Sequence, residues 1–139
     1  MTLPPDELRA LLRRVRTIAV VGLSPKPIRP SHSVARYLQQ AGYRIVPVNP
    51  GHGEILGEQS YPTLSAAARA HTIDVVDVFR RSEHAGAVVD EAIALQPPPQ
   101  LIWLQQGVVD AAAQARAAAA DIAFVMDHCL AVEHRHLEV

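Results

Sequence analysis

At 139 residues the chain has the length of one domain, and 49% apolar with 19% charged residues is an ordinary globular composition. The formal net charge of −1 excludes a strongly basic surface for nucleic acid or an anionic membrane, and no apolar run approaches the roughly 20 residues that span a bilayer. One cysteine, Cys129, excludes an internal disulfide. We therefore expect a cytoplasmic protein with a single domain over residues 1–139, because the N-terminus also lacks the pattern of a signal peptide.

The apolar pattern predicts five short strands separated by helices. An amphipathic helix led by Pro4 and Pro5 comes first, with acids at its start and arginines at its end. The strands are predicted, in chain order, at residues 18–21, 43–48, 73–79, 101–104 and 124–126. The segment 54–62 is predicted as a loop, and the residues after 126 as a loop or a closing helix.

Each helix between the strands has a candidate Ser, Thr or Asp cap at its start. The expected helices run from Ser31 or Ser33 to Gly42, from Thr63 to Ala70, from Ser82 to about Leu95 and from Asp110 to Ala120. Strands that alternate with helices at this spacing are typical of βαβ units. The sequence therefore predicts a Rossmann-like three-layer αβα domain, an α/β fold whose five-stranded parallel sheet has the order 3-2-1-4-5.

The loop after the first strand has the character of a phosphate site. Gly22 ends the strand, and a loop with Lys26 and Arg29 leads into the next helix. The second and third glycines of the dinucleotide fingerprint are absent, and Asn49 stands where an NAD site wants an acidic residue. These departures favour a ligand with an extra phosphate over NAD. No Walker loop is present, which disfavours ATP hydrolysis.

The ends of the predicted strands indicate where a ligand binds. In open parallel sheets the ligand lies outside the carboxyl ends of the strands, where the strand order reverses. Those ends read Gly22-Leu23-Ser24, Asn49-Pro50-Gly51, Phe79-Arg80-Arg81, Gln105-Gln106-Gly107 and Asp127-His128-Cys129.

Five motifs follow one another along nearly the whole chain. They are Val20-Val21-Gly22-Leu23-Ser24-Pro25-Lys26-Pro27 with Arg29-Pro30-Ser31 and Ser33, Tyr43-Arg44-Ile45-Val46-Pro47-Val48-Asn49-Pro50, Asp74-Val75-Val76-Asp77-Val78-Phe79-Arg80-Arg81, Trp103-Leu104-Gln105-Gln106-Gly107-Val108 and Val125-Met126-Asp127-His128-Cys129-Leu130. In this series the chain resembles the small stand-alone CoA-binding proteins. That family has the fold of the CoA-binding domain of the succinyl-CoA synthetase alpha subunit, which agrees with the fold predicted from the pattern.

The resemblance implies a ligand-binding set drawn from four strand ends. Its members are Gly22, Leu23 and Ser24 beside the pyrophosphate and adenosine, Lys26, Arg29 and Ser33 near phosphate, Asn49 and Pro50 at the adenine or ribose, and Phe79, Arg80, Gln105 and Gly107 along the nucleotide and pantetheine. This assignment is physically coherent, because the phosphates of CoA require cations and backbone donors.

The leading functional hypothesis is a protein that binds CoA or an acyl-CoA without catalysis, in a binding or regulatory role. No pair of acid and base stands out, and the chain has no room for the second domain that carries the phosphorylated histidine in the related ligases. Two alternatives remain: an NAD(P)-dependent oxidoreductase, and an acyl-CoA-handling enzyme that uses Cys129. A small-molecule nucleotide is the expected partner, with no nucleic acid and no membrane.

Several residues have a structural interpretation beside the functional one. Cys129 is interpreted first as a small buried residue, with a mixed disulfide to CoA as the alternative. Trp103 is expected in the core, and only one of Arg80 and Arg81 is expected to face the ligand. No metal site is predicted, because the spacing of the last acidic and histidine residues matches no zinc pattern. Those residues are His128, Glu133, His134 and His136.

Overall fold

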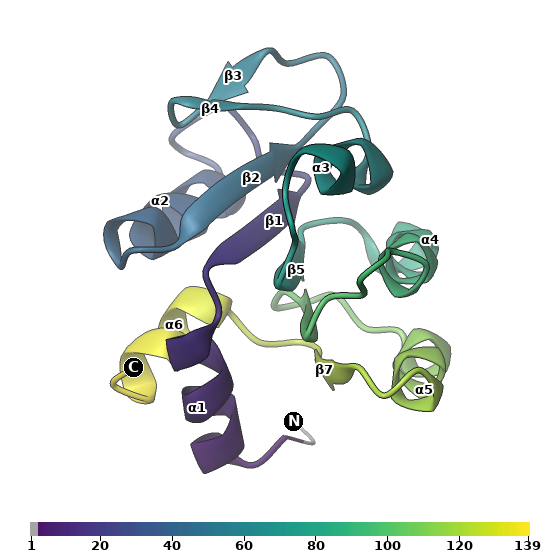
Figure 1. Cartoon of the computed structure of the whole chain (residues 1–139). Helices are drawn as coiled ribbons and strands as arrows, with labels where there is room; N and C mark the ends of the chain where they lie inside the picture. Colours follow the sequence, from purple (N-terminus) through teal and green to yellow (C-terminus); the bar gives the residue numbers. More distant parts are fainter. Residues whose placement is uncertain (1–2) are drawn as a thin grey trace.

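The computed structural model describes residues 3–139, so the first two residues of the predicted domain lie outside the described residues. The elements are α1 (Pro5–Arg14), β1 (Thr17–Val21), α2 (Pro30–Gln40), β2 (Arg44–Val48), β3 (Glu54–Ile55), β4 (Glu58–Gln59), α3 (Leu64–Ala70), β5 (Val75–Val78), α4 (Ser82–Ile93), β6 (Leu101–Leu104), α5 (Ala111–Ala119), β7 (Ala123–Val125) and α6 (Leu130–His136) (Figure 1). No helix among residues 3–139 is long and apolar enough to cross a membrane.

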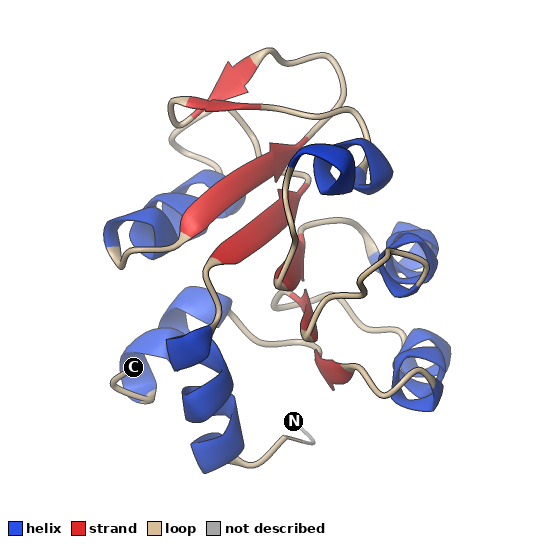
Figure 2. Cartoon of the chain, viewed as in Figure 1, coloured by secondary structure: helices blue, strands red, loops and turns tan. Residues whose placement is uncertain are grey.

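Three layers build the domain, as the sequence pattern predicts. A five-stranded parallel sheet forms the middle layer, and helices cover both of its faces (Figure 2). The apolar cluster on one face joins the sheet to α1, α2 and α6, and the cluster on the other face joins it to α3, α4 and α5. Apart from Asp77 on β5, the buried residues of the strands are apolar on both faces, and the strands therefore appear as nearly continuous apolar runs in the sequence.

The predicted strand order is wrong. The sheet has the order β2-β1-β5-β6-β7, which is 2-1-3-4-5 when its strands alone are numbered. β5 pairs directly with β1, and β2 lies at the edge of the sheet, where Tyr61 forms a parallel bridge with Val48 and donates its N–H to the Pro47 carbonyl. A proline in β2 suits an edge strand, since it removes a ladder donor. The order therefore reverses between β1 and β5.

Local signals predicted some helix starts and missed others. The Thr63 hydroxyl accepts a hydrogen bond from Ala66 N–H, and the Asp110 carboxylate accepts one from Ala113 N–H, as expected of caps. Ser82 is not a cap, because its hydroxyl instead accepts from Val109 N–H.

The segment predicted as a loop before α3 contains the short antiparallel hairpin β3–β4, and the closing segment forms α6. The hairpin turns at Leu56 and Gly57, both with positive φ, which suits a tight two-residue turn. Ile55 on β3 is buried against the core, which anchors the hairpin to the domain.

Two polar groups lie in the core of the sheet. Trp103 is fully buried, as predicted, and its indole N–H donates a 2.8 Å hydrogen bond to the His128 carbonyl. Asp77, which is also fully buried, lies on β5 between Val20 and Trp103 of the neighbouring strands. Neither carboxyl oxygen has a hydrogen-bond partner among the described residues, and burial raises the pKa of Asp77 well above its usual value. Burial therefore favours the neutral form of this carboxyl.

Candidate functional site

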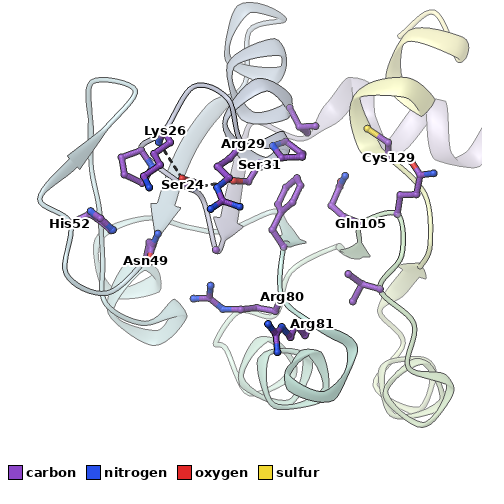
Figure 3. Close-up of a pocket in the computed structure, with 17 residues that line it drawn as sticks. Ser24, Lys26, Arg29, Ser31, Asn49, His52, Arg80, Arg81, Gln105 and Cys129 are labelled. Atoms are coloured by element: carbon purple, nitrogen blue, oxygen red, sulfur yellow. Dashed lines mark hydrogen bonds between the residues drawn. The ribbon is translucent and has the colours of Figure 1, made fainter.

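A cavity of about 900 Å³ lies at the carboxyl edge of the parallel sheet. It is next to the point between β1 and β5 where the strand order reverses, which is called the topological switch point. Its walls come from the β1–α2 region, from the residues that follow β2, β5 and β6, and from the residue before α6 (Figure 3). The lining residues are Gly22, Ser24, Pro25, Lys26, Arg29, Pro30, Ser31, Val34, Asn49, His52, Phe79, Arg80, Arg81, Gln105, Gln106, Val108 and Cys129. Segments far apart in the sequence thus meet where the rule for parallel sheets places a ligand.

Gly22 brings bare backbone to the cavity. Its φ is +90°, and a Cβ at this position would lie 2.1 Å from the Phe79 carbonyl oxygen and 2.9 Å from Nη1 of Arg80. Its N–H donates to the Val48 carbonyl at 2.9 Å, which holds the turn to the end of β2. Only glycine fits here, because both the backbone angle and the close neighbours exclude a side chain.

The loop after Gly22 is ordered by two serine hydroxyls. Ser24 N–H donates to Oγ of Ser31 at 3.0 Å, and Lys26 N–H donates to Oγ of Ser24 at 3.1 Å. Ser31 is buried, so the first of these bonds is shielded from water. The loop that bears Lys26 therefore has a defined path before α2 begins.

The start of α2 differs from the prediction. Arg29 occupies the N-cap position and Pro30 the first turn, and no side chain caps the helix. Ser31 serves the preceding loop, and Ser33 donates its hydroxyl hydrogen to the Pro30 carbonyl at 3.1 Å. Neither predicted serine is therefore the cap, and the first turn of α2 faces the cavity with Arg29 beside it.

Four cations line the cavity, and no carboxylate is among its lining residues as the structure describes them. Lys26 and Arg29 come from the β1–α2 loop, whereas Arg80 and Arg81 follow β5 (Figure 3). The sequence led us to expect that one of Arg80 and Arg81 caps a helix or faces water, and Arg81 occupies the N-cap position of α4 with a side chain that is 82% exposed. Arg81 has an acidic neighbour, Glu83, at 3.9 Å, but both side chains are exposed and the pair is weak. The cavity therefore has the charge that suits an anionic ligand.

Asn49 joins two walls of the cavity. Its side-chain amide donates a 2.7 Å hydrogen bond to the Leu23 carbonyl, and its backbone carbonyl accepts from Oγ of Ser60 at 3.1 Å. The glycine loop, the end of β2 and the segment after the hairpin are thus tied together by one residue.

The opposite end of the cavity lies at the start of α6. The Gln105 side-chain carbonyl accepts a 3.1 Å hydrogen bond from Leu130 N–H, which fixes the first turn of α6 against the end of β6. Cys129, just before α6, is half-buried: it packs against the apolar cluster and also lines the cavity, so its predicted burial is only partial. Val108 adds an apolar surface. This end of the cavity is neutral.

Most of the predicted site residues line the cavity: Gly22, Ser24, Lys26, Arg29, Asn49, Phe79, Arg80 and Gln105. Four others are not among its lining residues: Leu23, Ser33, Pro50 and Gly107. Leu23 is fully buried and serves through its carbonyl, and Gly107 donates its N–H to Oδ1 of Asp127 at 2.8 Å. The strand-end rule thus predicted where the cavity lies, and it failed in predicting which residues of each turn face the cavity.

The predicted ligand-binding set leaves out His52, Arg81 and Cys129, which line the cavity, although Arg81 and Cys129 belong to the strand-end sequences named above. Each follows a strand end by a few positions, so the general rule pointed to its neighbourhood. The direction of each side chain depends on the conformation of its loop, and the hydrophobic pattern of the sequence does not predict loop conformation. For His52 the flanking glycines were a usable signal, because the chain can fold back over the strand end there.

The histidines near the C-terminus lie apart from one another. His128 pairs with Glu133 at 3.5 Å, whereas Nδ1 of His134 lies 2.8 Å from the Tyr37 hydroxyl. Burial lowers the pKa of His134 below its usual value. Within residues 3–139, no group of three or more His, Cys, Asp or Glu residues is placed to hold a metal ion.

A doubly wound parallel sheet with a glycine turn and cations at its switch point defines the class of nucleotide-binding α/β domains. Residues 16–135 match the sequence model of the CoA binding domain, and the chain belongs to that family. YneT of Bacillus subtilis (strain 168) is 40% identical over 128 residues, which are 92% of this chain and 92% of YneT.

Solved structures of similar proteins share the whole fold. A Thermus thermophilus protein, cell-free ID.343, is 39% identical with a TM-score of 0.89, covering 97% of this chain and 99% of that one. A hypothetical protein from Pyrococcus horikoshii OT3 is 33% identical with a TM-score of 0.91, covering 99% of this chain and 94% of that one.

Proposed function

We propose that the protein binds coenzyme A or an acyl-CoA in the cavity at the carboxyl edge of the sheet, as a non-catalytic binding or regulatory protein. The observation that supports this most is that one cavity combines a cationic end without carboxylates and a neutral end. CoA has the same division, because its phosphates are anionic and its pantetheine is neutral.

The cationic end suits the nucleotide. Gly22 lets the ligand approach bare backbone, and the Arg80 guanidinium lies beside it. Backbone donors and a planar guanidinium together are the usual partners of a diphosphate. Asn49 holds the glycine loop and borders the place of the adenine or ribose in this arrangement.

The neutral end suits the pantetheine and an acyl group. Val108 gives apolar surface there, and Gln105 and Cys129 line the cavity beside α6. Phe79 and Val34 are further apolar lining residues of the cavity. A volume of about 900 Å³ is at the upper range of small-molecule sites, as a long ligand requires.

The separation between the imidazole and the thiol of the cavity favours a binding role over catalysis. Among the lining residues, His52 follows β2 and Cys129 precedes α6, so the imidazole and the thiol come from different ends of the cavity. A nucleophile needs its base within hydrogen-bond reach. A second candidate, an acyl-CoA-handling enzyme that uses Cys129, is favoured only by the position of that thiol on the cavity wall.

Calorimetric titration with CoA, acetyl-CoA, NADH and ATP tests the proposal. CoA and acetyl-CoA are expected to bind, and Arg80→Ala is expected to weaken both about tenfold or more through loss of a charge-assisted contact. Arg69→Ala on the exposed surface of α3 is the matched control and is expected to leave affinity unchanged. Tight binding of NADH without binding of CoA would overturn the proposal in favour of the oxidoreductase.

A further inference from the structure

A second groove lies along α2, outside the cavity. Its volume is about 320 Å³, and it shares no lining residue with the cavity. The turn before α2 and one side of the helix form its walls, and the lining residues are Pro27, His32, Ser33, Arg36, Tyr37 and Gln40. The volume is at the lower end of the range for small-molecule sites. The proposed function makes no use of this groove.

We propose that the groove is a second ligand site, which binds a compact oxyanion: the carboxylate or phosphate group of a small molecule. His32 and Arg36 are its principal donors. The site lies outside the cavity, so the proposal does not depend on the binding of CoA.

His32 is the observation that points to a ligand. The residue is only 9% exposed, yet its side chain makes no hydrogen bond, ion pair or ring contact within residues 3–139. In the same part of the chain, the completely buried polar side-chain atoms without a partner are the two carboxyl oxygens of Asp77. The ring nitrogens of His32 are therefore not sealed in the core, and they are accessible from the groove that the residue lines. Because buried polar side chains normally have a hydrogen-bond partner, the partner of His32 comes from the groove, as water or as a ligand.

Arg36 gives the groove its charge. It lies one helical turn after His32, and residues four apart are neighbours on the surface of a helix. Its guanidinium is in no ion pair in the described part of the chain, and no carboxylate side chain from that part lines the groove. A guanidinium matches two oxygens of a carboxylate or phosphate with paired N–H donors. A cation beside a buried donor, without an anion of the protein, therefore favours an oxyanion over water.

Tyr37 gives the groove a fixed wall. Its hydroxyl lies 2.8 Å from Nδ1 of His134 on α6, and the guanidinium carbon of Arg135 lies 5.0 Å from the centre of its ring. Both helices pack on the same face of the sheet (Figure 1). Arg135 therefore adds a second positive charge next to a lining residue, and it also has no ion pair among residues 3–139.

The other polar residues of the groove suit the body of a small molecule. Ser33 donates its hydroxyl hydrogen to the Pro30 carbonyl at 3.1 Å, so its oxygen is left to accept a hydrogen bond from a ligand. Gln40, one turn beyond Arg36, offers a neutral amide. The groove thus has a cationic part at His32 and Arg36 and a neutral polar part at Gln40.

Solution NMR at constant pH tests the proposal with three salts at equal ionic strength: sodium phosphate, sodium succinate and sodium chloride. We expect phosphate, succinate or both to shift the ring resonances of His32 and the backbone amides of residues 32–40 along a saturating curve. Chloride is expected to shift neither. Saturation by phosphate alone assigns a phosphate group to the ligand, and saturation by succinate alone assigns a carboxylate. The amides of Gly22, Arg80 and Gln105 report an anion in the cavity separately.

Two variants locate the binding. Arg36→Gln is expected to weaken it about tenfold or more, because a charge-assisted contact is lost. Arg69→Gln is the matched control, since it also removes an exposed helical arginine, but from α3 on the opposite face of the sheet. It should leave the binding curve unchanged. His32→Gln keeps a polar side chain at the buried position and is expected to weaken binding about threefold to tenfold. If His32→Gln does not fold, Arg36→Gln decides.

Two results overturn the proposal. One is that neither phosphate nor succinate shifts the resonances of α2 beyond the effect of chloride. The other is that Arg36→Gln binds the anion as tightly as Arg69→Gln. Because the reporters lie outside the cavity, either result leaves the binding of CoA in place, and a failure of CoA to bind leaves this second site in place.

Discussion

The side-chain amide of Asn49 donates a 2.7 Å hydrogen bond to the backbone carbonyl of Leu23, and so joins the end of β2 to the loop that follows β1. Leu23 itself is fully buried and offers no side chain to the cavity. The bond therefore sets the position of the glycine turn from the neighbouring strand, at the point where two walls of the site meet.

Asn49→Ala is expected to weaken CoA binding about fivefold to twentyfold and to lower the free energy of unfolding by about 1 kcal/mol, the usual net value of one such bond. Calorimetry and urea unfolding measure the two effects. Gln39→Ala is the matched control, because its amide donates a similar 3.0 Å bond to the Leu56 carbonyl away from the cavity. Equal loss of affinity in both variants would contradict a local role for Asn49.

Gly22→Ala is expected to destabilise the fold far more than a second glycine substitution, Gly42→Ala. Both glycines have positive φ, but nothing lies within 4 Å of a Cβ at Gly42, whereas the Phe79 carbonyl oxygen would lie 2.1 Å from one at Gly22. We expect a loss of about 1 to 2 kcal/mol at Gly42 from backbone strain and about 3 to 5 kcal/mol at Gly22 from strain plus the clash. Denaturant unfolding of the two variants gives the comparison directly.

Asp77→Val is expected to stabilise the protein by about 1 to 3 kcal/mol at neutral pH, because it removes a buried carboxyl without a partner. Asp74→Ala, just before β5, is expected to have the opposite effect. Its carboxylate accepts from the N–H groups of Arg16 and Thr17 at 2.9 and 3.0 Å, and their loss leaves donors unpaired. A destabilised Asp77→Val variant would show that the carboxyl has a favourable role in the native core.

The pH dependence of stability tests the state of the same carboxyl. The native pKa of Asp77 is raised well above its usual value, so the native state keeps a proton that the unfolded state loses above about pH 4. Stability from this group is complete below the unfolded pKa and falls as the pH rises toward the native pKa. Thermal unfolding between pH 4 and pH 8 should therefore show a less negative slope in Asp77→Val than in the unaltered protein.

His134 has the opposite dependence. Its pKa is lowered by burial, so the unfolded state takes up more protons as the pH falls below about 6.5, and stability falls with it. The ring packs edge-on against Tyr37 and Tyr43, with Arg135 over the Tyr37 ring, so a second positive charge is unfavourable there. His134→Asn is expected to flatten the loss of stability between pH 7 and pH 5, and His136→Asn is expected to leave it unchanged.

Cys129→Ser separates binding from catalysis. The thiol lies on the neutral end of the cavity, away from the cations, so CoA affinity is expected to change by less than about threefold, since a neutral exposed contact contributes little. Incubation of the unaltered protein with acyl-CoA, followed by mass spectrometry, should show no acyl adduct on Cys129. An adduct that the serine variant lacks would favour the enzyme over the binding protein.

Local signals in the sequence were sufficient for the strands of the main sheet and for the position of the cavity. Short apolar runs predicted each strand of the main sheet, and Thr63 and Asp110 marked true helix starts because a cap depends on residues only three positions away. The rule for parallel sheets then placed Gly22, Asn49 and Arg80 at one edge, since it needs only the strand ends.

The order of the strands and the direction of the loop side chains were decided by tertiary structure. β5 pairs with β1, and Tyr61 bridges the outer edge of β2 through backbone hydrogen bonds, two long-range pairings that no local pattern reveals. The cavity positions of His52 and Cys129 depend in the same way on contacts from elsewhere, Ser60 for one and Gln105 at the start of α6 for the other. Strand and helix formation depend on neighbours along the chain, whereas pairing and loop direction depend on partners that become neighbours only when the chain has folded.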